Sequence, residues 1–290
     1  MAPADSGLFD RLERFYDAMP RPWARIEEIG SLVLFIREGE GWPYYARPRP
    51  GSPTPSAAEI TEVRARQRDL GLPETFEWVH ETSPDLLAVA RSAGLDVLLA
   101  PLLVLDPAAL VPDLPLRDAT LRYLDPAGPT FAADLHASRT VSRLGFAAPA
   151  YQAPLEMAEK ALFIQGAGPT ERDAAEPLDA EAVRQARELF ASGAFLTAVA
   201  ESPAEGIVAT ATSQRDGDVA EVVGVATLPS ARRRGYASQL TATLSGRLVA
   251  DDVDLVFLSA GDDDVARLYT RVGFRRVGTA CIAEPAAALL

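Results

Sequence analysis

Residues 224–244, GVATLPSARRRGYASQLTATL, contain the side chains best suited to binding an anion. Three arginines, residues 232–234, follow an apolar run and precede Gly235 and a predicted helix. The first amides of a helix lack partners and the helix dipole adds partial positive charge there, so arginines at this end are unfavourable unless an anion balances them. Gly235 permits a positive φ or close backbone approach, and Ala237 leaves room for a bulky ligand. The pattern favours a phosphate-binding turn.

A basic loop without a ligand is the alternative interpretation of this stretch. In that case carboxylates such as Asp251 or Asp252 would neutralise the arginines. Two other glycine pairs, in GAG at 166–168 and GEG at 39–41, fit neither the Walker A nor the dinucleotide pattern and predict turns.

The composition narrows the classes of function. A formal charge of −13 argues against sequence-independent nucleic-acid binding and suits a cationic small substrate. The single cysteine, Cys281, excludes an internal disulfide and a multi-cysteine metal site. His80 and His136 are far apart and outside any H-E-x-x-H pattern, so no metal is expected.

The chain also lacks the signals of membrane insertion or export. Its longest apolar stretch, residues 95–111, is broken by Asp and Pro, and the N-terminus has no basic-then-apolar order. We therefore expect no membrane association and a cytoplasmic location. One lysine against 27 arginines suggests a GC-rich bacterial coding sequence.

Periodicity and turn residues predict helices and strands along the whole chain. In the first half, the pattern predicts helices at 6–18, 57–71 and 83–94, one apolar strand within 24–38, further strands at 75–81 and 96–106, and a Pro/Gly/Ser-rich loop at 46–57. In the second half, it predicts helices at 130–146, 180–193, 237–251 and 263–273, strands at 118–125, 195–202, 206–215, 219–228, 253–260 and 275–284, a loop at 166–179 and a hairpin turn at Asp216-Gly217.

The segment VGVATLPSARRRGYASQL resembles the acetyl-CoA-binding motif of the GCN5-related N-acetyltransferase superfamily. The motif core, Gln/Arg-x-x-Gly-x-Gly/Ala, is matched by Arg232, Gly235 and Ala237. VARLYTRVGFRRVG resembles a later signature of the same family, in the right order and at compatible spacing. The resemblance covers about residues 117–290. It implies a mixed α/β fold, a central, mostly antiparallel sheet flanked by helices.

A second, altered copy of this fold is expected in the first half. Residues 20–106 resemble the later part of such a domain, but ARPRPGSPTPSAAEI replaces the arginine-glycine turn and its prolines remove amide donors. We therefore predict a degenerate N-terminal lobe, residues 1–115, and a catalytic domain, residues 116–290, in tandem.

The resemblance implies that two segments bind coenzyme A, namely the arginine-glycine turn and the strand before it. Backbone amides of residues 233–237 would hold the pyrophosphate of coenzyme A, the Arg232 and Arg233 side chains would add charge-assisted contacts to its phosphate oxygens, and the strand would pair with the pantetheine arm. An aspartate stands where the family commonly has Asn; it could cap the fourth helix but would repel phosphate. The implied cofactor-binding residues are Val225, Ala226, Thr227, Arg232, Arg233, Arg234, Gly235, Tyr236, Ala237 and Asp264.

Two residues are implied to be catalytic. Tyr269 matches the tyrosine that protonates the departing thiolate in the family; its alternative role is packing in the core. Glu221 stands eleven residues before Arg232, at the offset of the glutamate base of the histone-acetylating branch, and partial burial would raise its pKa toward a useful value. The alternative, a solvent-facing glutamate on a half-buried strand, stays open. Tyr236 and Glu284 are lesser candidates.

The resemblance implies an acetyl-CoA-dependent N-acetyltransferase that acts by direct attack of a primary amine within a ternary complex. The acceptor would be a small molecule or a peptide, with no nucleic acid and no metal involved. Cys281 lies outside both motifs and is not expected to be a nucleophile. The alternative is a non-catalytic acyl-CoA-binding or regulatory protein. The tandem lobes predict either a monomer that acts as a pseudo-dimer or a homodimer.

Overall fold

A computed structural model describes residues 4–39, 41, 43–112, 116–148 and 166–286 of the chain. It divides into two compact units, and no single cut of the sequence separates them. Unit 1 contains Met1–Val104, Ser259–Arg267 and Arg275–Leu290, and unit 2 contains Leu105–Leu258 and Leu268–Phe274. The predicted boundary at 115/116 stays a prediction. In the structure, the C-terminal strand belongs to the same unit as most of the N-terminal half.

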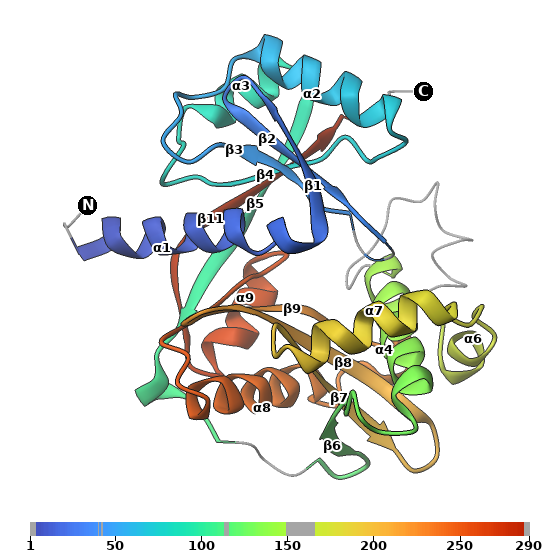
Figure 1. Cartoon of the computed structure of the whole chain (residues 1–290). Coiled ribbons are helices and arrows are strands. Elements are labelled where there is room, and N and C mark those ends of the chain that lie inside the picture. Colours follow the sequence, from blue (N-terminus) through green and yellow to red (C-terminus); the bar gives the residue numbers. More distant parts are fainter. Residues whose placement is uncertain (1–3, 40, 42, 113–115, 149–165, 287–290) are drawn as a thin grey trace. The chain divides into compact units, whose positions relative to one another are not determined.

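Unit 1 is a mixed sheet with helices on both faces (Figure 1). Its strands lie in the order β1-β2-β3-β4-β11-β5, so the last strand of the chain is inserted between β4 and β5. β11 pairs with β4 in antiparallel register, whereas β3 and β4 are parallel. The elements are α1 (Ala4–Ala18), β1 (Ala24–Ile29), β2 (Leu32–Arg37), β3 (Ala46–Pro48), α2 (Ala57–Asp69), β4 (Phe76–Val79), α3 (Leu86–Ser92), β5 (Leu95–Leu105) and β11 (Phe274–Pro285).

Alternation along the strands assigns the helices to the two faces of this sheet. Phe76 and Trp78 of β4 belong to an apolar core with residues of α2 and α3. Glu77, between them, points to the other face, where it pairs with Arg47 at 2.7 Å. Arg47 also stacks over the ring of Tyr16 in α1, with 4.0 Å to the centroid. Helices α2 and α3 therefore cover one face and α1 covers the other.

The start of α2 is closed by a carboxylate of its own chain. Glu59 accepts hydrogen bonds from the Ser56 amide at 2.7 Å and from the Ser31 amide at 2.6 Å, while the Ser56 hydroxyl accepts from the Glu59 amide. Hydrogen bonds from Ser56 are the main cause that lowers the pKa of Glu59 to about 2. Gly30 in the β1–β2 turn has a φ of 57°, which favours glycine, and a β-carbon there would also displace this carboxylate. Glu59 thus occupies the helix N-terminus that a phosphate would need.

We predict that Glu59→Gln destabilises unit 1 by about 0.5–2 kcal/mol at neutral pH, the range typical of lost helix caps. The folded-state pKa is below the unfolded value, so the contribution is fully present above about pH 4.3 and is lost as the pH falls through about 2. Urea unfolding at pH 7 and at pH 3 measures the difference. Glu62→Gln removes the same charge from an exposed position of α2 and is the control. Equal effects of the two variants at pH 7 would contradict the capping role.

In unit 2, the strands lie in the order β10-β9-β8-β7-β6. Neighbours from β6 to β9 are antiparallel and only β9 and β10 are parallel. The elements are β6 (Thr120–Tyr123), α4 (Phe131–Ala147), α6 (Pro169–Asp173), α7 (Ala180–Ala191), β7 (Phe195–Ser202), β8 (Gly206–Asp216), β9 (Val219–Thr227), η4 (Pro229–Ala231), α8 (Tyr236–Ala250) and β10 (Leu255–Ser259). Helix α9 (Asp263–Thr270) follows β10 and precedes β11.

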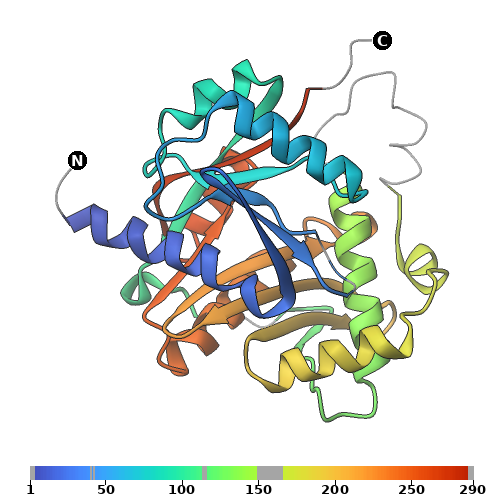
Figure 2. The ribbon, with the colours of Figure 1, turned by 45° about the horizontal axis from the view of Figure 1, so that its top comes forward.

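Two neighbouring residues of β6 show that α4 and α8 lie on opposite faces of this sheet. Arg122 forms a two-bond ion pair with Asp134 of α4, and the Tyr123 hydroxyl donates to the Thr243 carbonyl of α8 at 3.1 Å. Successive strand residues point to opposite faces, so the two helices do too. Helix α7 joins α4 on its face, as both views show (Figures 1 and 2), through Phe190 against Phe131 with ring centroids 5.3 Å apart.

The mixed, mostly antiparallel α/β fold is confirmed in each unit, with three local errors in the predicted elements. Residues 24–38 form a hairpin of β1 and β2 around Gly30 (φ 57°), where one strand was expected. Strand β3 lies inside the predicted loop 46–57, and α6 inside the predicted loop 166–179. The hairpin turn at Gly30 interrupts one continuous apolar pattern, and β3 and α6 have only three and five residues, too few for periodicity to detect.

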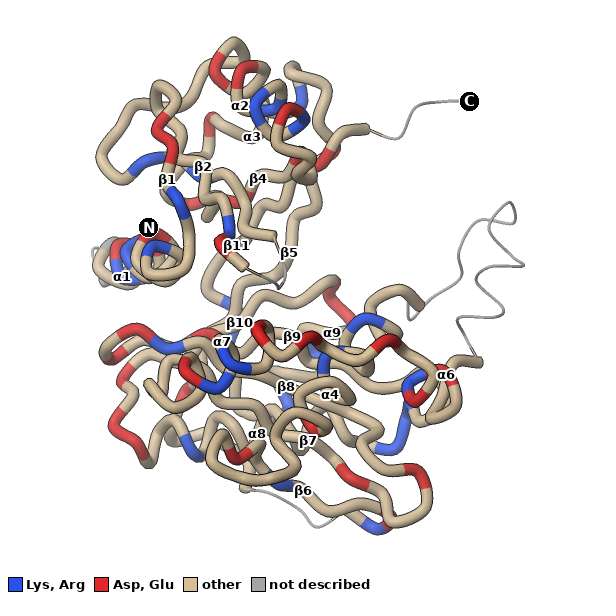
Figure 3. Tube along the Cα trace, turned by 45° about the vertical axis from the view of Figure 1, so that its right-hand side comes forward, with Lys and Arg blue, Asp and Glu red and all other residues tan. Residues whose placement is uncertain are grey.

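Neither a membrane span nor a metal cluster is found in the described ranges. None of their helices is both long and apolar enough to cross a bilayer. Within the same ranges, no group of three or more His, Cys, Asp or Glu side chains is arranged to hold a metal ion. Acidic and basic residues are interspersed along the trace of both units (Figure 3).

Candidate acyl-donor site

Strand β9 carries a β-bulge and then separates from β10. Thr210 and Thr212 of β8 pair with Ala226 and Val223, so Gly224 and Val225 stand opposite a single residue of β8. Gly224 has a φ of 61°, which favours glycine. On the other edge, β9 pairs with β10 only from Val219 to Glu221. The predicted pantetheine-binding residues Val225, Ala226 and Thr227 therefore lie on the part of β9 that has no partner in β10.

The turn after β9 has the backbone form of an anion-binding site. Arg233 and Gly235 both adopt left-handed conformations, with φ values of 64° and 87°. Left-handed residues in such turns direct successive N–H groups into a shared concavity. Gly235 is the residue before α8, and no side chain of the described residues caps the first turn of that helix, which begins at Tyr236 and Ala237. The first amides of α8 thus stay available, in contrast to the closed start of α2.

Arg232 is directed to another helix. Its guanidinium donates to the carbonyls of Gly145, at 2.8 Å, and Ala148, at the C-terminal end of α4. These carbonyls lack helical partners, and a cation there is favoured by the helix dipole. The side chain is half-buried, and burial lowers its pKa. The helix dipole at α4, and not at α8, is what this arginine compensates.

Arg234 is neutralised by carboxylates of unit 2. It pairs with Glu205 at 2.6 Å and with Asp118 at 3.3 Å, and the bond to Glu205 is the main cause of its raised pKa. Asp251, one of the expected partners, pairs with Arg247 instead. Arg233 is exposed and forms no ion pair within the described residues. It is the arginine of the three that is placed to meet an incoming anion.

Tyr236 lies beneath this charged group. Its side chain is 1% exposed, and burial is the main cause of its raised pKa, with the charge of Asp118 contributing. The hydroxyl forms no hydrogen bond within the described part of the chain. The ring therefore anchors the first turn of α8 in the core, while its backbone amide remains at the helix start.

Glu221 lies at the point where β9 and β10 separate. It is the last residue of β9 paired with β10, opposite Phe257, and it faces Gln214 on β8. Its side chain is 8% exposed, so the alternative of a solvent-facing glutamate is wrong for this structure. A buried carboxylate beside the unpaired part of β9 has the surroundings expected of a general base.

Tyr269 and Asp264 lie in α9. Tyr269 is 7% exposed and packs edge-on against Phe274, with 6.2 Å between ring centroids. Burial raises the pKa of Tyr269 well above its usual value. Asp264 is exposed and pairs with Arg267. Asp262, and not Asp264, caps the helix: its carboxylate accepts from the Val265 amide at 2.8 Å.

Helix α4 supplies residues that the sequence reading missed. A β-carbon on Gly145 would come within 3.0 Å of the Ala226 β-carbon and 3.2 Å of the Thr227 carbonyl, so glycine lets α4 approach β9 just after the bulge. One turn earlier, the Ser142 hydroxyl lies 3.4 Å from the Gly224 carbonyl. The signal was present in the sequence, because a lone glycine inside a helical pattern often marks close packing.

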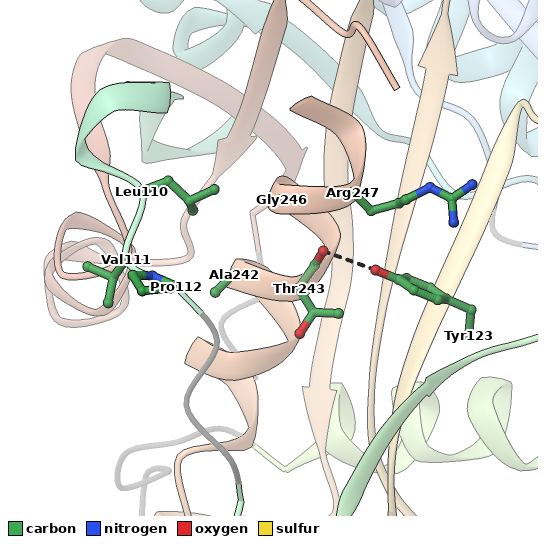
Figure 4. Close-up of a pocket in the computed structure, with 8 residues that line it drawn as sticks. All are labelled: Leu110, Val111, Pro112, Tyr123, Ala242, Thr243, Gly246 and Arg247. Carbon is green, nitrogen blue, oxygen red and sulfur yellow. Dashed lines mark hydrogen bonds between the residues drawn. The ribbon is translucent and has the colours of Figure 1, made fainter. Parts of the chain in front are cut away.

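A separate groove of about 290 Å³ lies on the middle of α8 (Figure 4). Tyr123, Thr243 and Arg247 form one part of its lining, and apolar residues 110–112 form another. Ala242 is seven residues beyond Gly235, which corresponds to about 10 Å along a helix. The groove is therefore distinct from the turn at the start of α8.

Comparisons with known proteins agree with this geometry. The family model described as FR47-like protein matches residues 204–282. No curated protein matches the chain. Among solved structures, a GCN5-related N-acetyltransferase from Kribbella flavida is similar over 97% of both chains, with 21% identity and a TM-score of 0.65.

Two further structures share the architecture at lower similarity. A GCN5-related N-acetyltransferase-like protein from Streptococcus suis has a TM-score of 0.52 at 12% identity, over 97% of this chain and 99% of its own. A tandem GNAT protein from the clavulanic acid biosynthesis pathway, determined without acetyl-CoA, has a TM-score of 0.50 at 15% identity, over 90% of this chain and 80% of its own. The chain therefore has the fold of the GCN5-related N-acetyltransferases, including the tandem form, with an FR47-like segment at residues 204–282.

Proposed function

We propose that this protein is an N-acetyltransferase that moves an acetyl group from acetyl-CoA to a primary amine. The observation that carries the proposal is the sequence of a bulged strand, a turn with two left-handed residues and an uncapped helix start, β9 to α8. In this arrangement the amides from Arg233 to Ala237 would bind the pyrophosphate, Arg233 would add a cation, and the unpaired part of β9 would hold the pantetheine arm.

In the proposed reaction, Glu221 acts as the base and Tyr269 as the acid. The neutral amine nitrogen attacks the thioester carbonyl, so that a C–N bond forms and the C–S bond breaks. Glu221 takes the proton of the amine, directly or through a water molecule, because a protonated amine has no lone pair for the attack. Tyr269 returns a proton to the thiolate, and its raised pKa means that it donates only to a strong base. Unpaired backbone at the Gly224–Val225 bulge would orient the acetyl carbonyl.

Titration with acetyl-CoA and a thiol-release screen over amines, polyamines, aminoglycosides and peptides test the proposal. We expect saturable binding by calorimetry and release of coenzyme A with at least one amine. Cys281 does not interfere with a thiol reagent in the folded protein, since it is fully buried and burial raises its pKa to about 12. Absence of acetyl-CoA binding would refute the donor site.

The second candidate is a non-catalytic acyl-CoA-binding protein, which the packing of Tyr269 on Phe274 favours. Tyr269→Phe separates the two. For an enzyme, we expect turnover to fall by about 10²-fold, the usual size of a lost general acid, while acetyl-CoA binding persists. For a binding protein, the wild type itself releases no thiol with any amine tested.

The remaining expectations form part of the same proposal. The acceptor is a small molecule or a peptide, which suits the net charge of −13, and the protein acts in the cytoplasm. It works as a monomer with tandem lobes or as a homodimer, without a metal ion.

A further inference from the structure

The geometry points to Arg232 as a positioning residue that locks helix α4 to the turn and thereby sets the β-bulge, and not as a ligand of phosphate. This inference rests on the proposed function and assigns a different task to the first residue of the motif. Its basis is the direction of the side chain. The guanidinium donates to the Gly145 and Ala148 carbonyls at the end of α4.

Helix α4 contacts β8 and β9 at three successive positions of one face. The Ser138 hydroxyl bonds to the Thr210 hydroxyl at 2.7 Å, in the core. Ser142 follows four residues later and lies against the Gly224 carbonyl, and Gly145 meets Ala226 three residues after that. All three are small residues, so the helix axis can approach the strands closely. The position of α4 therefore determines the local form of β9 at the bulge.

Arg232 connects the turn after β9 to the C-terminal end of the same helix, α4. The chain runs from the bulge at Gly224 along β9 and η4 to Arg232, which returns to α4 through its guanidinium. The bulge that would orient the acetyl carbonyl and the turn that would hold the pyrophosphate are thus tied to the same helix. The guanidinium is half-buried, and hydrogen bonds in such surroundings are electrostatically stronger than the same bonds in water.

The consequence is a division of labour between adjacent arginines. Arg233 is exposed beside the first amides of α8, so its loss should weaken the binding of coenzyme A and of acetyl-CoA equally. Loss of Arg232 should release α4, change the bulge and reduce the advantage that acetyl-CoA has over coenzyme A. That advantage depends on the acetyl carbonyl, which coenzyme A lacks.

Calorimetric titration of the full-length protein with coenzyme A and with acetyl-CoA tests the assignment. For the wild type, we expect acetyl-CoA to bind about three- to tenfold tighter than coenzyme A, the worth of one hydrogen bond. Arg232→Gln is expected to bring this ratio to about one while changing the Kd of coenzyme A less than about twofold. Arg233→Gln should raise both Kd values by about fivefold and keep the ratio, as expected for an exposed charge contact.

Two further variants guard against a general loss of structure. Arg232→Lys keeps a cation that reaches helix C-terminal carbonyls and should restore part of the ratio. Gly145→Ala perturbs the approach of α4 to β9 while keeping every side chain of the turn, and should lower the ratio as Arg232→Gln does. Arg232→Gln raising the Kd of coenzyme A as much as Arg233→Gln, with the ratio unchanged, would overturn the inference. Failure of the wild type to bind coenzyme A would instead refute the proposed function.

Discussion

Ala283→Asp is expected to unfold unit 1, although it lies only seven residues before Leu290. Ala283 is fully buried in the apolar core of that unit and pairs with Phe76 across β4. An aspartate there would be a buried charge without a partner, at a cost of several kcal/mol, about 3–5 or more. Few single domains tolerate such a loss, because their total stability is about 5–15 kcal/mol.

The neighbouring Cys281 reports the outcome directly. It is 0% exposed, so a thiol reagent should not label it in the folded wild type. We expect rapid labelling in Ala283→Asp and a loss of the unit 1 transition in thermal unfolding. Glu284→Gln changes the next residue, which is exposed, and should leave Cys281 protected. A protected thiol in Ala283→Asp would show that β11 is not part of the unit 1 core.

This prediction follows from a chain path that local sequence patterns do not reveal. The final strand is predicted at 275–284 and found at Phe274–Pro285, so its existence was readable from alternation. Its neighbours were not, because β11 pairs with β4, about 200 residues earlier. The same reasoning applies to Arg234, whose partner Asp118 is 116 positions away. The spacing of residues along the chain predicts whether a segment is a helix or a strand. Which distant segments pair with each other is seen only in the folded structure.

The turn shows which part of a candidate site can be predicted. Gly235 and the start of α8 were identified because backbone conformation depends on residue type over a few positions. The roles of the three arginines could not be divided by the same argument. Compensation by an anion was expected for all of them, yet Arg232 is directed to α4 and Arg234 to two carboxylates. Only Arg233 keeps the position that the charge argument required.

Gly235→Ala is expected to raise the Kd of acetyl-CoA by at least about tenfold, which corresponds to 1.4 kcal/mol. An added β-carbon would meet nothing within 4 Å in the protein itself, so the substitution fits sterically without ligand. Two effects then remain: the φ of 87° is strained for any residue with a β-carbon, by about 1–2 kcal/mol, and the methyl group would stand where the pyrophosphate must approach the amides.

Gly217→Ala separates these two effects. Gly217 has a φ of 57° in the β8–β9 hairpin and also has open space around a new β-carbon, so the backbone strain is comparable. Both variants should lose similar thermal stability, while only Gly235→Ala should lose stabilisation by acetyl-CoA. Because ligand stabilisation follows RT ln(1 + [L]/Kd), a tenfold weaker Kd at saturating ligand removes about 1.4 kcal/mol of it. Equal acetyl-CoA binding by the two variants would mean that the ligand approaches α8 somewhere other than its N-terminal turn.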